Sequence, residues 1–387
     1  MRRPTLAACA LTLCLARAAG REPLELPKGK PWDESFRSPL HIRLSQDGLR
    51  AYVVNHTRGS VSIVDVRGRK VEGEFPVGRS PAHAALSPDG KLLYVTSLRD
   101  NAVRVVDLSA RRTARVFKTG LGPYGVEVSS GGDRLFIVES LSDRVAILDA
   151  ASGRTLSRTP VGREAKYIAV TPDGERLVAG NGLSRSVSIL DARTGKLLET
   201  RDIGRASVGR QVACAPGGRW AVAAHLVSHD EQITTQINRG WMHSNGFTLM
   251  DLSRKGHRLT LLLDTLLDGA ANPWGLALSA DGRRLYVSLS GVHEVAFVDL
   301  ERTLAFASEV KAEQVVPLER DVELMVEKKA FARRVPSGGK GPRGLALSEP
   351  LGELLVANYF DDTVSVLDAS SGGLKALIPL YDKPPLL

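Results

Sequence analysis

Short hydrophobic runs alternate with polar turns along almost the whole chain. Within residues 81–107, the apolar segment Ala82–Ser87 leads into the turn Pro88-Asp89-Gly90, and two further apolar segments, Leu92–Ser97 and Val103–Val106, follow. Proline presets the backbone of such a turn, and glycine accepts the positive φ that a Cβ disfavours. Apolar runs of this length bounded by turn residues predict β-strands.

This pattern recurs seven times. Aligned on a proline or its substitute, the repeats begin at Pro39, Pro81, Pro123, Ala165, Gly209, Pro273 and Pro342. The first four starts are 42 residues apart, and in six repeats an aspartate follows the start after 26 residues. A period near 42 residues is typical of a four-stranded propeller blade. The sequence therefore predicts an all-β fold, a seven-bladed β-propeller of four-stranded antiparallel blades over residues 39–380.

Two insertions interrupt the period. Residues 226–246 lengthen a loop of the fifth repeat, and residues 300–341 separate the sixth repeat from the seventh, with a short helix predicted around 320–333. Long insertions in a regular array usually serve binding. We expect both insertions to flank the face at which the first strand of every repeat begins, which we call the rim face.

The two ends of the chain have a different composition. Residues 1–20 are typical of a signal peptide, because Arg2 and Arg3 precede a short apolar run that ends in small residues. Residues 21–38 are predicted to be an N-terminal extension and 381–387 a C-terminal tail. We expect a periplasmic or secreted protein without a membrane span. Cys214, the one cysteine outside the signal peptide, occupies an apolar strand position and is predicted to be a buried structural thiol.

The net charge is only moderately positive. The formal charge of +9 falls to about +6 once Arg2, Arg3 and Arg17 leave with the signal peptide. Such a modest excess in an exported protein does not favour nucleic-acid binding. The hydrophobic share of 43% is ample for a core.

The residues just after each repeat start are predicted to surround the mouth of the central channel. Many of them are basic or aromatic, where small or apolar residues are usual. The predicted ligand or partner site consists of these residues together with His225 and two residues of the fifth-repeat insertion: His41, His83, Tyr124, Lys166, Tyr167, Arg210, His225, Arg239, Trp241, Trp274 and Arg343. A cationic, aromatic funnel suits a carboxylate, a phosphate or an acidic patch of a partner. The alternative is that these basic side chains only keep the rim solvated.

Catalytic and metal-binding patterns are weak. His41, His83 and His225 could converge, but no His-Glu-x-x-His spacing is present, and we predict neither a metal nor a cofactor. No set of nucleophile, base and orienting residue is visible, so we predict no catalytic residues. Glu139 is the one acid expected in the funnel, and it would be the first candidate for a general base, before His41 or His83.

Tetrapeptides at the ends of the second strands carry a family resemblance. Tyr52-Val53-Val54-Asn55 and Leu355-Val356-Ala357-Asn358 resemble the YVTN (YncE-like) family of β-propellers over residues 39–380. Residues 234–242, with Arg239 and Trp241, resemble the branch of that family often linked to a C-terminal di-haem cytochrome c peroxidase-like domain. The chain contains no Cys-x-x-Cys-His, so the resemblance implies either a stand-alone propeller or one whose redox partner, a c-type cytochrome or di-haem peroxidase, is on another chain.

Two functions remain open at this point. The first is an exported, non-enzymatic binding or scaffold propeller whose basic rim face docks a redox partner or an anionic ligand. The second is a propeller enzyme, either a lactonase-type hydrolase or a cofactor-dependent oxidoreductase, with its site in the funnel.

Overall fold

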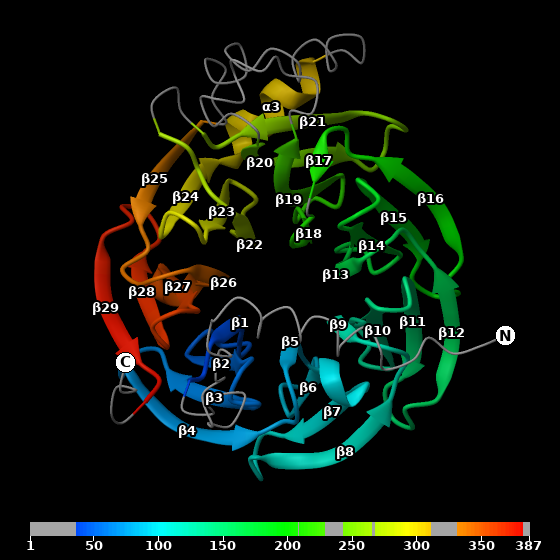
Figure 1. Cartoon of the computed structure of the whole chain (residues 1–387), viewed down its shortest axis with the longest axis vertical. Helices are drawn as coiled ribbons and strands as arrows, with labels where there is room; N and C mark the ends of the chain where they lie inside the picture. Colours follow the sequence, from blue (N-terminus) through cyan, green and yellow to red (C-terminus); the bar gives the residue numbers. More distant parts are fainter. Residues whose placement is uncertain (1–35, 208, 229–242, 265–267, 311–330, 382–387) are drawn as a thin grey trace, which may run out of the picture. The chain divides into compact units, whose positions relative to one another are not determined.

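Seven antiparallel sheets surround a central axis in a computed structural model that describes residues 36–207, 209–228, 243–264, 268–310 and 331–381 (Figure 1). All seven belong to one compact unit. The prediction of an all-β, seven-bladed propeller is confirmed. The predicted signal peptide lies outside the described residues. No helix in the described ranges is long and apolar enough to span a membrane.

Each blade is a meander whose first strand lies nearest the axis. The first four blades consist of β1 (Pro39–Leu44), β2 (Arg50–Asn55), β3 (Ser60–Asp65), β4 (Lys70–Pro76), β5 (Pro81–Leu86), β6 (Leu92–Ser97), β7 (Ala102–Asp107), β8 (Arg112–Lys118), β9 (Pro123–Val128), β10 (Arg134–Glu139), β11 (Arg144–Asp149), β12 (Thr155–Pro160), β13 (Ala165–Val170), β14 (Arg176–Asn181), β15 (Ser186–Asp191) and β16 (Leu197–Asp202).

The remaining three blades follow the same order, except that two short strands fill the inner position of blade five. They consist of β17 (Ala206–Ser207), β18 (Val212–Cys214), β19 (Trp220–Ser228), β20 (His243–Asp251), β21 (Arg258–Leu262), β22 (Pro273–Leu278), β23 (Arg284–Leu289), β24 (Glu294–Asp299), β25 (Ala332–Pro336), β26 (Pro342–Ser348), β27 (Glu353–Asn358), β28 (Thr363–Asp368) and β29 (Leu374–Pro379). Six inner strands begin at the predicted repeat starts.

Apolar side chains of adjacent blades form the core. Between blades one and two, for example, Tyr52, Val54 and Phe75 pack with Ala84 and Leu93. The second and third strands contact neighbours on both faces, which explains their nearly continuous apolar sequence. Burial of one such large side chain contributes roughly 1.5–3 kcal/mol to folding.

The recurrent aspartates are turn formers, as predicted. Asp89 accepts a hydrogen bond from the Ser87 hydroxyl (2.5 Å), and Ser87 in turn accepts one from the Leu92 amide (2.9 Å). Asp107 accepts hydrogen bonds from two amides of the turn that follows it. Short polar side chains that bond to nearby amides favour turns over regular strands.

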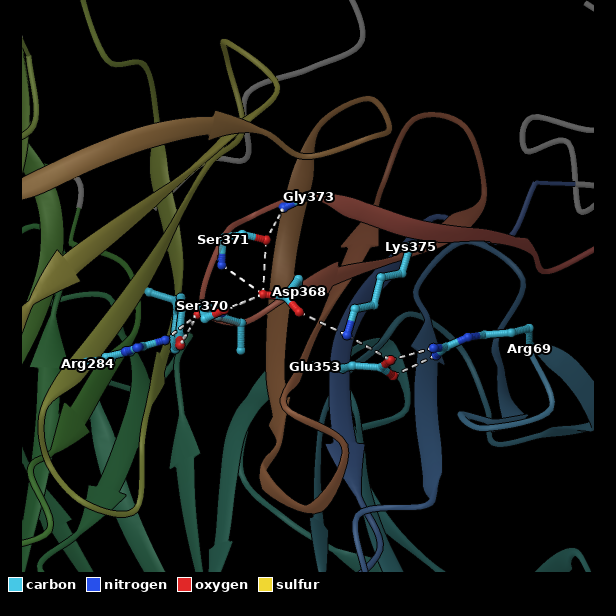
Figure 2. A network of polar contacts seen from close by, with 10 residues as sticks. Arg69, Arg284, Glu353, Asp368, Ser370, Ser371, Gly373 and Lys375 are labelled. Atoms are coloured by element: carbon cyan, nitrogen blue, oxygen red, sulfur yellow. Dashed lines mark hydrogen bonds and ion pairs between the residues drawn. The ribbon is translucent and has the colours of Figure 1, made fainter.

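The ring closes between blades one and seven without a shared strand. Arg69 of blade one forms a bidentate pair with Glu353 of blade seven, at 2.7 and 2.5 Å, and Lys375 joins Glu353 to Asp368 (Figure 2). The Ser348 hydroxyl also donates to the Gly48 carbonyl across this junction (2.8 Å). Side-chain contacts and apolar packing therefore close the ring.

The blade-six insertion differs from its prediction. Its described helix is α3 (Leu300–Glu309), which is capped by the Asp299 side chain. Arg333 lies in β25, so the prediction of a helix that reaches Arg333 is wrong. Residues 311–330 lie outside the described ranges. The Leu300 amide donates to Arg283, in the turn opposite the rim face. The helix α3 leaves from the end of the third strand opposite the rim face, so the expectation that the insertion flanks the rim is wrong for this described part.

The blade-five insertion does begin at the rim face. Strands β19 and β20 are nine residues long and pair over their whole length, from Trp220↔Asp251 to Ser228↔His243. Most strands of the other blades have six residues. Residues 229–242, and with them Arg239 and Trp241, lie outside the part that the structure describes.

Candidate functional site

A bulge at the start of the inner strands places side chains at the rim. In six blades the pairing register shifts between the first residue of the inner strand and the third or fourth. A bulge leaves a residue out of the ladder and re-aims its side chain. The residues that directly follow these strand starts in blades three, four, six and seven are Tyr124, Lys166, Trp274 and Arg343.

Two arginines flank one tryptophan at the rim. The Cζ atoms of Arg210, from blade five, and Arg343, from blade seven, lie 4.1 and 4.2 Å from the ring centroid of Trp274 in blade six. A guanidinium attracted to an indole ring in this way is held by a cation–π interaction. Arg343 also lies 3.4 Å from the ring centroid of Tyr359. Three consecutive blades thus hold two positive charges against one indole ring.

Two tyrosines continue this cluster. The Trp274 indole N–H donates to the Tyr167 hydroxyl (2.9 Å), and the two tyrosine hydroxyls, of Tyr124 and Tyr167, lie 3.5 Å apart. Burial raises the pKa of both phenols, so both keep their protons at neutral pH. We call Tyr124, Tyr167, Arg210, Trp274 and Arg343 the funnel cluster; the structure brings these five predicted site residues together.

Lys166 differs from the two arginines of the cluster because it has an acidic partner. Its ammonium group forms an ion pair with Glu164, two residues earlier. Glu164 is an acid of the rim that the sequence analysis missed, because it precedes the repeat start. The charge of Lys166 is therefore already neutralised within the described chain.

His41 and His83 lie in a buried pair next to the cluster. Their ring centroids are 3.7 Å apart, and His83 lies 6.0 Å from the ring centroid of Tyr167. Desolvation lowers the pKa of His83 to about 3 and holds the pKa of His41 well below 6.5. Both imidazoles are neutral at pH 7, so the expectation that they add positive charge to the funnel is wrong.

The channel holds an ion pair that the sequence analysis did not single out. Arg43 Nη2 of β1 lies 3.8 Å from Glu127 Oε2 of β9. Burial raises the pKa of Glu127, and the Arg43 charge opposes that shift. Repeat alignment contained the signal, because the other five blades all have alanine at this position: Ala85, Ala169, Ala213, Ala277 and Ala346.

His225 and Glu139 are structural groups away from the funnel cluster. His225 is fully buried; its Nδ1 donates to the Leu226 carbonyl (2.8 Å) and its Nε2 accepts from Thr248 (2.6 Å). The Glu139 carboxylate is fully buried, accepts from the Gly120 amide (2.7 Å) and pairs with Arg158 (2.9 Å). The idea that Glu139 is an acid of the funnel is therefore wrong, because the second strand ends inside the blade packing.

In three other blades, the last residue of the second strand, the position of Glu139, is an asparagine with a structural role. Asn181 donates from one amide nitrogen to Ser186 and Ser188 of the next strand, both at 3.0 Å, and Asn55 and Asn358 make the equivalent bonds. Side chains at this position tie the second strand to the third. The tetrapeptide that ends in asparagine is thus a feature of the blade.

Within the described ranges, no three His, Cys, Asp or Glu side chains are grouped so that they could hold a metal ion. The Cys214 thiol is largely buried against the core, and desolvation raises its pKa to about 12. A thiol with so high a pKa is a poor nucleophile. The chemistry that the funnel cluster offers is donation of hydrogen bonds and positive charge.

Hydrazine synthase resembles this chain in sequence and in structure. Subunit beta of hydrazine synthase from Kuenenia stuttgartiensis is 27% identical over 158 residues, which make up 41% of this chain and 40% of the relative. A chain of the solved K. stuttgartiensis hydrazine synthase superposes with a TM-score of 0.83 at 27% identity, covering 89% of this chain and 99% of that one. This chain is similar to the beta subunit of hydrazine synthase.

The other comparisons concern the fold alone. A functionally unknown protein from Desulfotomaculum acetoxidans superposes with a TM-score of 0.64 at 13% identity, covering 85% of this chain and 95% of its own. No family model matches the chain. The sequence match to the hydrazine synthase subunit spans less than half of that subunit's length, whereas the structural match spans nearly all of the solved chain.

Proposed function

We propose that this chain is an exported, non-enzymatic propeller subunit that docks a redox partner, a c-type cytochrome or di-haem peroxidase on another chain, at its rim face. The observation that carries the proposal is the superposition on hydrazine synthase, which covers 99% of that chain at a TM-score of 0.83. The matching relative is named as a subunit, and a subunit works beside other chains. The resemblance of residues 234–242 to the cytochrome-linked YVTN branch adds the redox character of the partner.

The local chemistry supports a binding role over catalysis. The acid–base candidates named from the sequence already have partners: Glu139 pairs with Arg158, and His41 and His83 are buried, each with its Nδ1 bonded to a backbone group. A general base must be able to reach the proton that it removes. The funnel cluster instead presents fixed cations and hydroxyl donors, which suit electrostatic recognition.

The test is gentle purification of the full chain from its native host, followed by size-exclusion chromatography and an ultraviolet–visible spectrum. We expect the chain to elute with a second protein and with a Soret band. Denaturing separation should then assign the haem to the second chain. Elution of the chain alone, with a featureless spectrum, would contradict the proposal. The same chain expressed without its host partners serves as the control and should be colourless.

A further inference from the structure

Two rim arginines have no carboxylate partner in the described part of the chain. Arg210 donates to the amide oxygen of Asn272 (3.1 Å), and Arg343 contacts the rings of Trp274 and Tyr359. The nearby acid Glu164 is paired with Lys166. By contrast, many arginines elsewhere in the propeller pair with an acid, as Arg334 does with Glu294. The funnel cluster therefore carries two positive charges that are not neutralised locally.

The way in which these arginines are held leaves donors unused. Stacking on an aromatic ring occupies the face of a guanidinium and leaves the N–H groups at its edge free. The Nε atoms of both Arg210 and Arg343 are buried and make no hydrogen bond within the described residues. Partial burial also lowers the pKa of both guanidiniums, which reflects the cost of a desolvated charge. An anion beside them would relieve this cost.

The tyrosines add a neutral donor to the same place. The Tyr167 oxygen accepts the indole N–H of Trp274, so a phenolic proton of the Tyr124–Tyr167 pair remains for a further acceptor. Both phenols lie near Arg210 and Arg343, whose charges oppose the rise of the phenol pKa values. Trp274 has a guanidinium against its ring from each neighbouring blade, so the ring already has two cationic partners within the chain.

We propose that the funnel cluster is a carboxylate-binding site, in which Arg210 and Arg343 hold the anion by their edge N–H groups and a tyrosine hydroxyl donates to it. A planar carboxylate matches the edge of a guanidinium. Phosphate sites usually add amides of a helix N-terminus or a glycine-rich turn, whereas the donors of this cluster are side chains of strand and bulge residues. The carboxylate comes either from a free small molecule or from an acidic side chain of the docked partner.

The first experiment titrates succinate into the purified full chain by calorimetry at constant ionic strength. We expect saturable binding that Arg343→Gln weakens about tenfold or more, because a charged hydrogen-bonded pair is lost. Tyr124→Phe, which keeps the ring and removes only the hydroxyl, should weaken binding by a smaller factor. Arg163→Gln is the matched control, because Arg163 is an exposed rim-face arginine outside the cluster, and it should bind as the wild type does.

The second experiment separates the two sources of the carboxylate, and it rests on the proposed docking function. If wild-type and Arg163→Gln chains retain the partner on purification and Arg343→Gln sheds it, the partner supplies the carboxylate, whether or not succinate binds. If Arg343→Gln loses succinate but keeps the partner, the ligand is a free molecule. Both results support the site.

Other results overturn the site. Equal succinate binding by wild type and Arg343→Gln, or tighter binding of inorganic phosphate than of succinate, contradicts a carboxylate site. Absence of succinate binding together with partner retention by Arg343→Gln also overturns it, while the proposed docking function stands. If wild type binds succinate but copurifies with no partner, the docking function fails and the site remains. Circular dichroism of each variant verifies that it is folded.

Discussion

His41, His83 and His225 are imidazoles that the fold keeps uncharged. Each is buried, and the partner atoms of His225 fix its neutral form: its Nδ1–H faces a carbonyl, and its Nε2 accepts from a hydroxyl. Desolvation lowers its pKa to about 4. The arginines of the funnel cluster behave differently, because a guanidinium stays protonated in proteins and keeps its charge in spite of partial burial. Residue type thus decides which rim side chains can attract an anion.

Acid should therefore destabilise the protein in a defined range. In the unfolded chain these histidines bind protons near pH 6.5, whereas His225 in the folded chain binds one only near pH 4. The stability that a neutral histidine contributes is complete above about pH 6.5 and is lost as the pH falls towards the folded pKa. In this window, each such histidine makes the free energy of unfolding rise with pH by up to about 1.4 kcal/mol per pH unit.

His225→Gln tests this linkage. We measure the free energy of unfolding by urea at a series of pH values. Between pH 4 and 6.5, we expect it to rise less steeply with pH in the variant than in the wild type, by up to about 1.4 kcal/mol per pH unit, which corresponds to one proton. His243→Gln, which replaces an exposed histidine, is the control and should leave the slope unchanged. An unaltered slope in His225→Gln would contradict a neutral, buried His225.

Close approach of inner strands is the main constraint at the scale of elements. A Cβ on Gly344 of β26 would lie 2.7 Å from the Cα of His41 and 2.9 Å from the carbonyl oxygen of Leu40, both in β1. Gly125 and Gly275 occupy the same repeat position in other blades, and a Cβ there would also meet backbone of the next inner strand. Glycine at this position lets neighbouring inner strands approach around the channel, while His41, His83 and Tyr167 fill the space that remains.

Gly344→Ala should accordingly be costly. We expect it to lower the free energy of unfolding by about 1–3 kcal/mol, because backbone of blade one cannot move aside as a flexible side chain could. Gly217→Ala is the matched control: no atom lies within 4 Å of its added Cβ, and its effect should stay within about 0.5 kcal/mol. Chemical denaturation of both variants measures the difference, and equal stabilities would show that the ring adjusts freely at this junction.

Ring closure is decided at the scale of the whole molecule. Every blade consists of consecutive strands, so no strand from one end of the chain completes a blade at the other end. The junction between the first and last blades depends on a shared apolar cluster that includes Ile42, Val53, Leu355 and Val366, and on the pair Arg69–Glu353. Glu353 is only 5% exposed, and the Arg69 guanidinium holds the pKa of its carboxylate below the usual value.

Glu353→Gln should weaken this junction. Loss of the bidentate, charge-assisted pair is expected to cost about 1.5–3 kcal/mol in urea unfolding at neutral pH. Glu301→Gln is the comparison, because it breaks an exposed pair with Arg283 and should cost less than about 1 kcal/mol. Should the two variants lose the same stability, the Arg69–Glu353 pair would have no special part in closing the ring.

The sequence by itself determined the fold and the register of its repeats. The 42-residue spacing, the turn residues and the apolar runs are local properties, and they sufficed to locate the starts of six inner strands at Pro39, Pro81, Pro123, Ala165, Pro273 and Pro342. Local hydrogen bonds of the aspartates and the short apolar runs between turns carry this information along the chain. The same alignment also selected the five residues of the funnel cluster.

Only the tertiary structure decided what these side chains do. Whether a histidine is charged depends on how much water its neighbours exclude, and whether an arginine is paired depends on residues far away in the chain. For this reason the sequence placed Glu139 in the funnel, treated His41 and His83 as cations, and passed over Arg43, Glu127 and Tyr359. The direction in which the blade-six insertion leaves likewise depends on the end of the strand that it follows. Distances between blades, which no local pattern encodes, set the Arg210–Trp274–Arg343 arrangement and with it the proposed anion site.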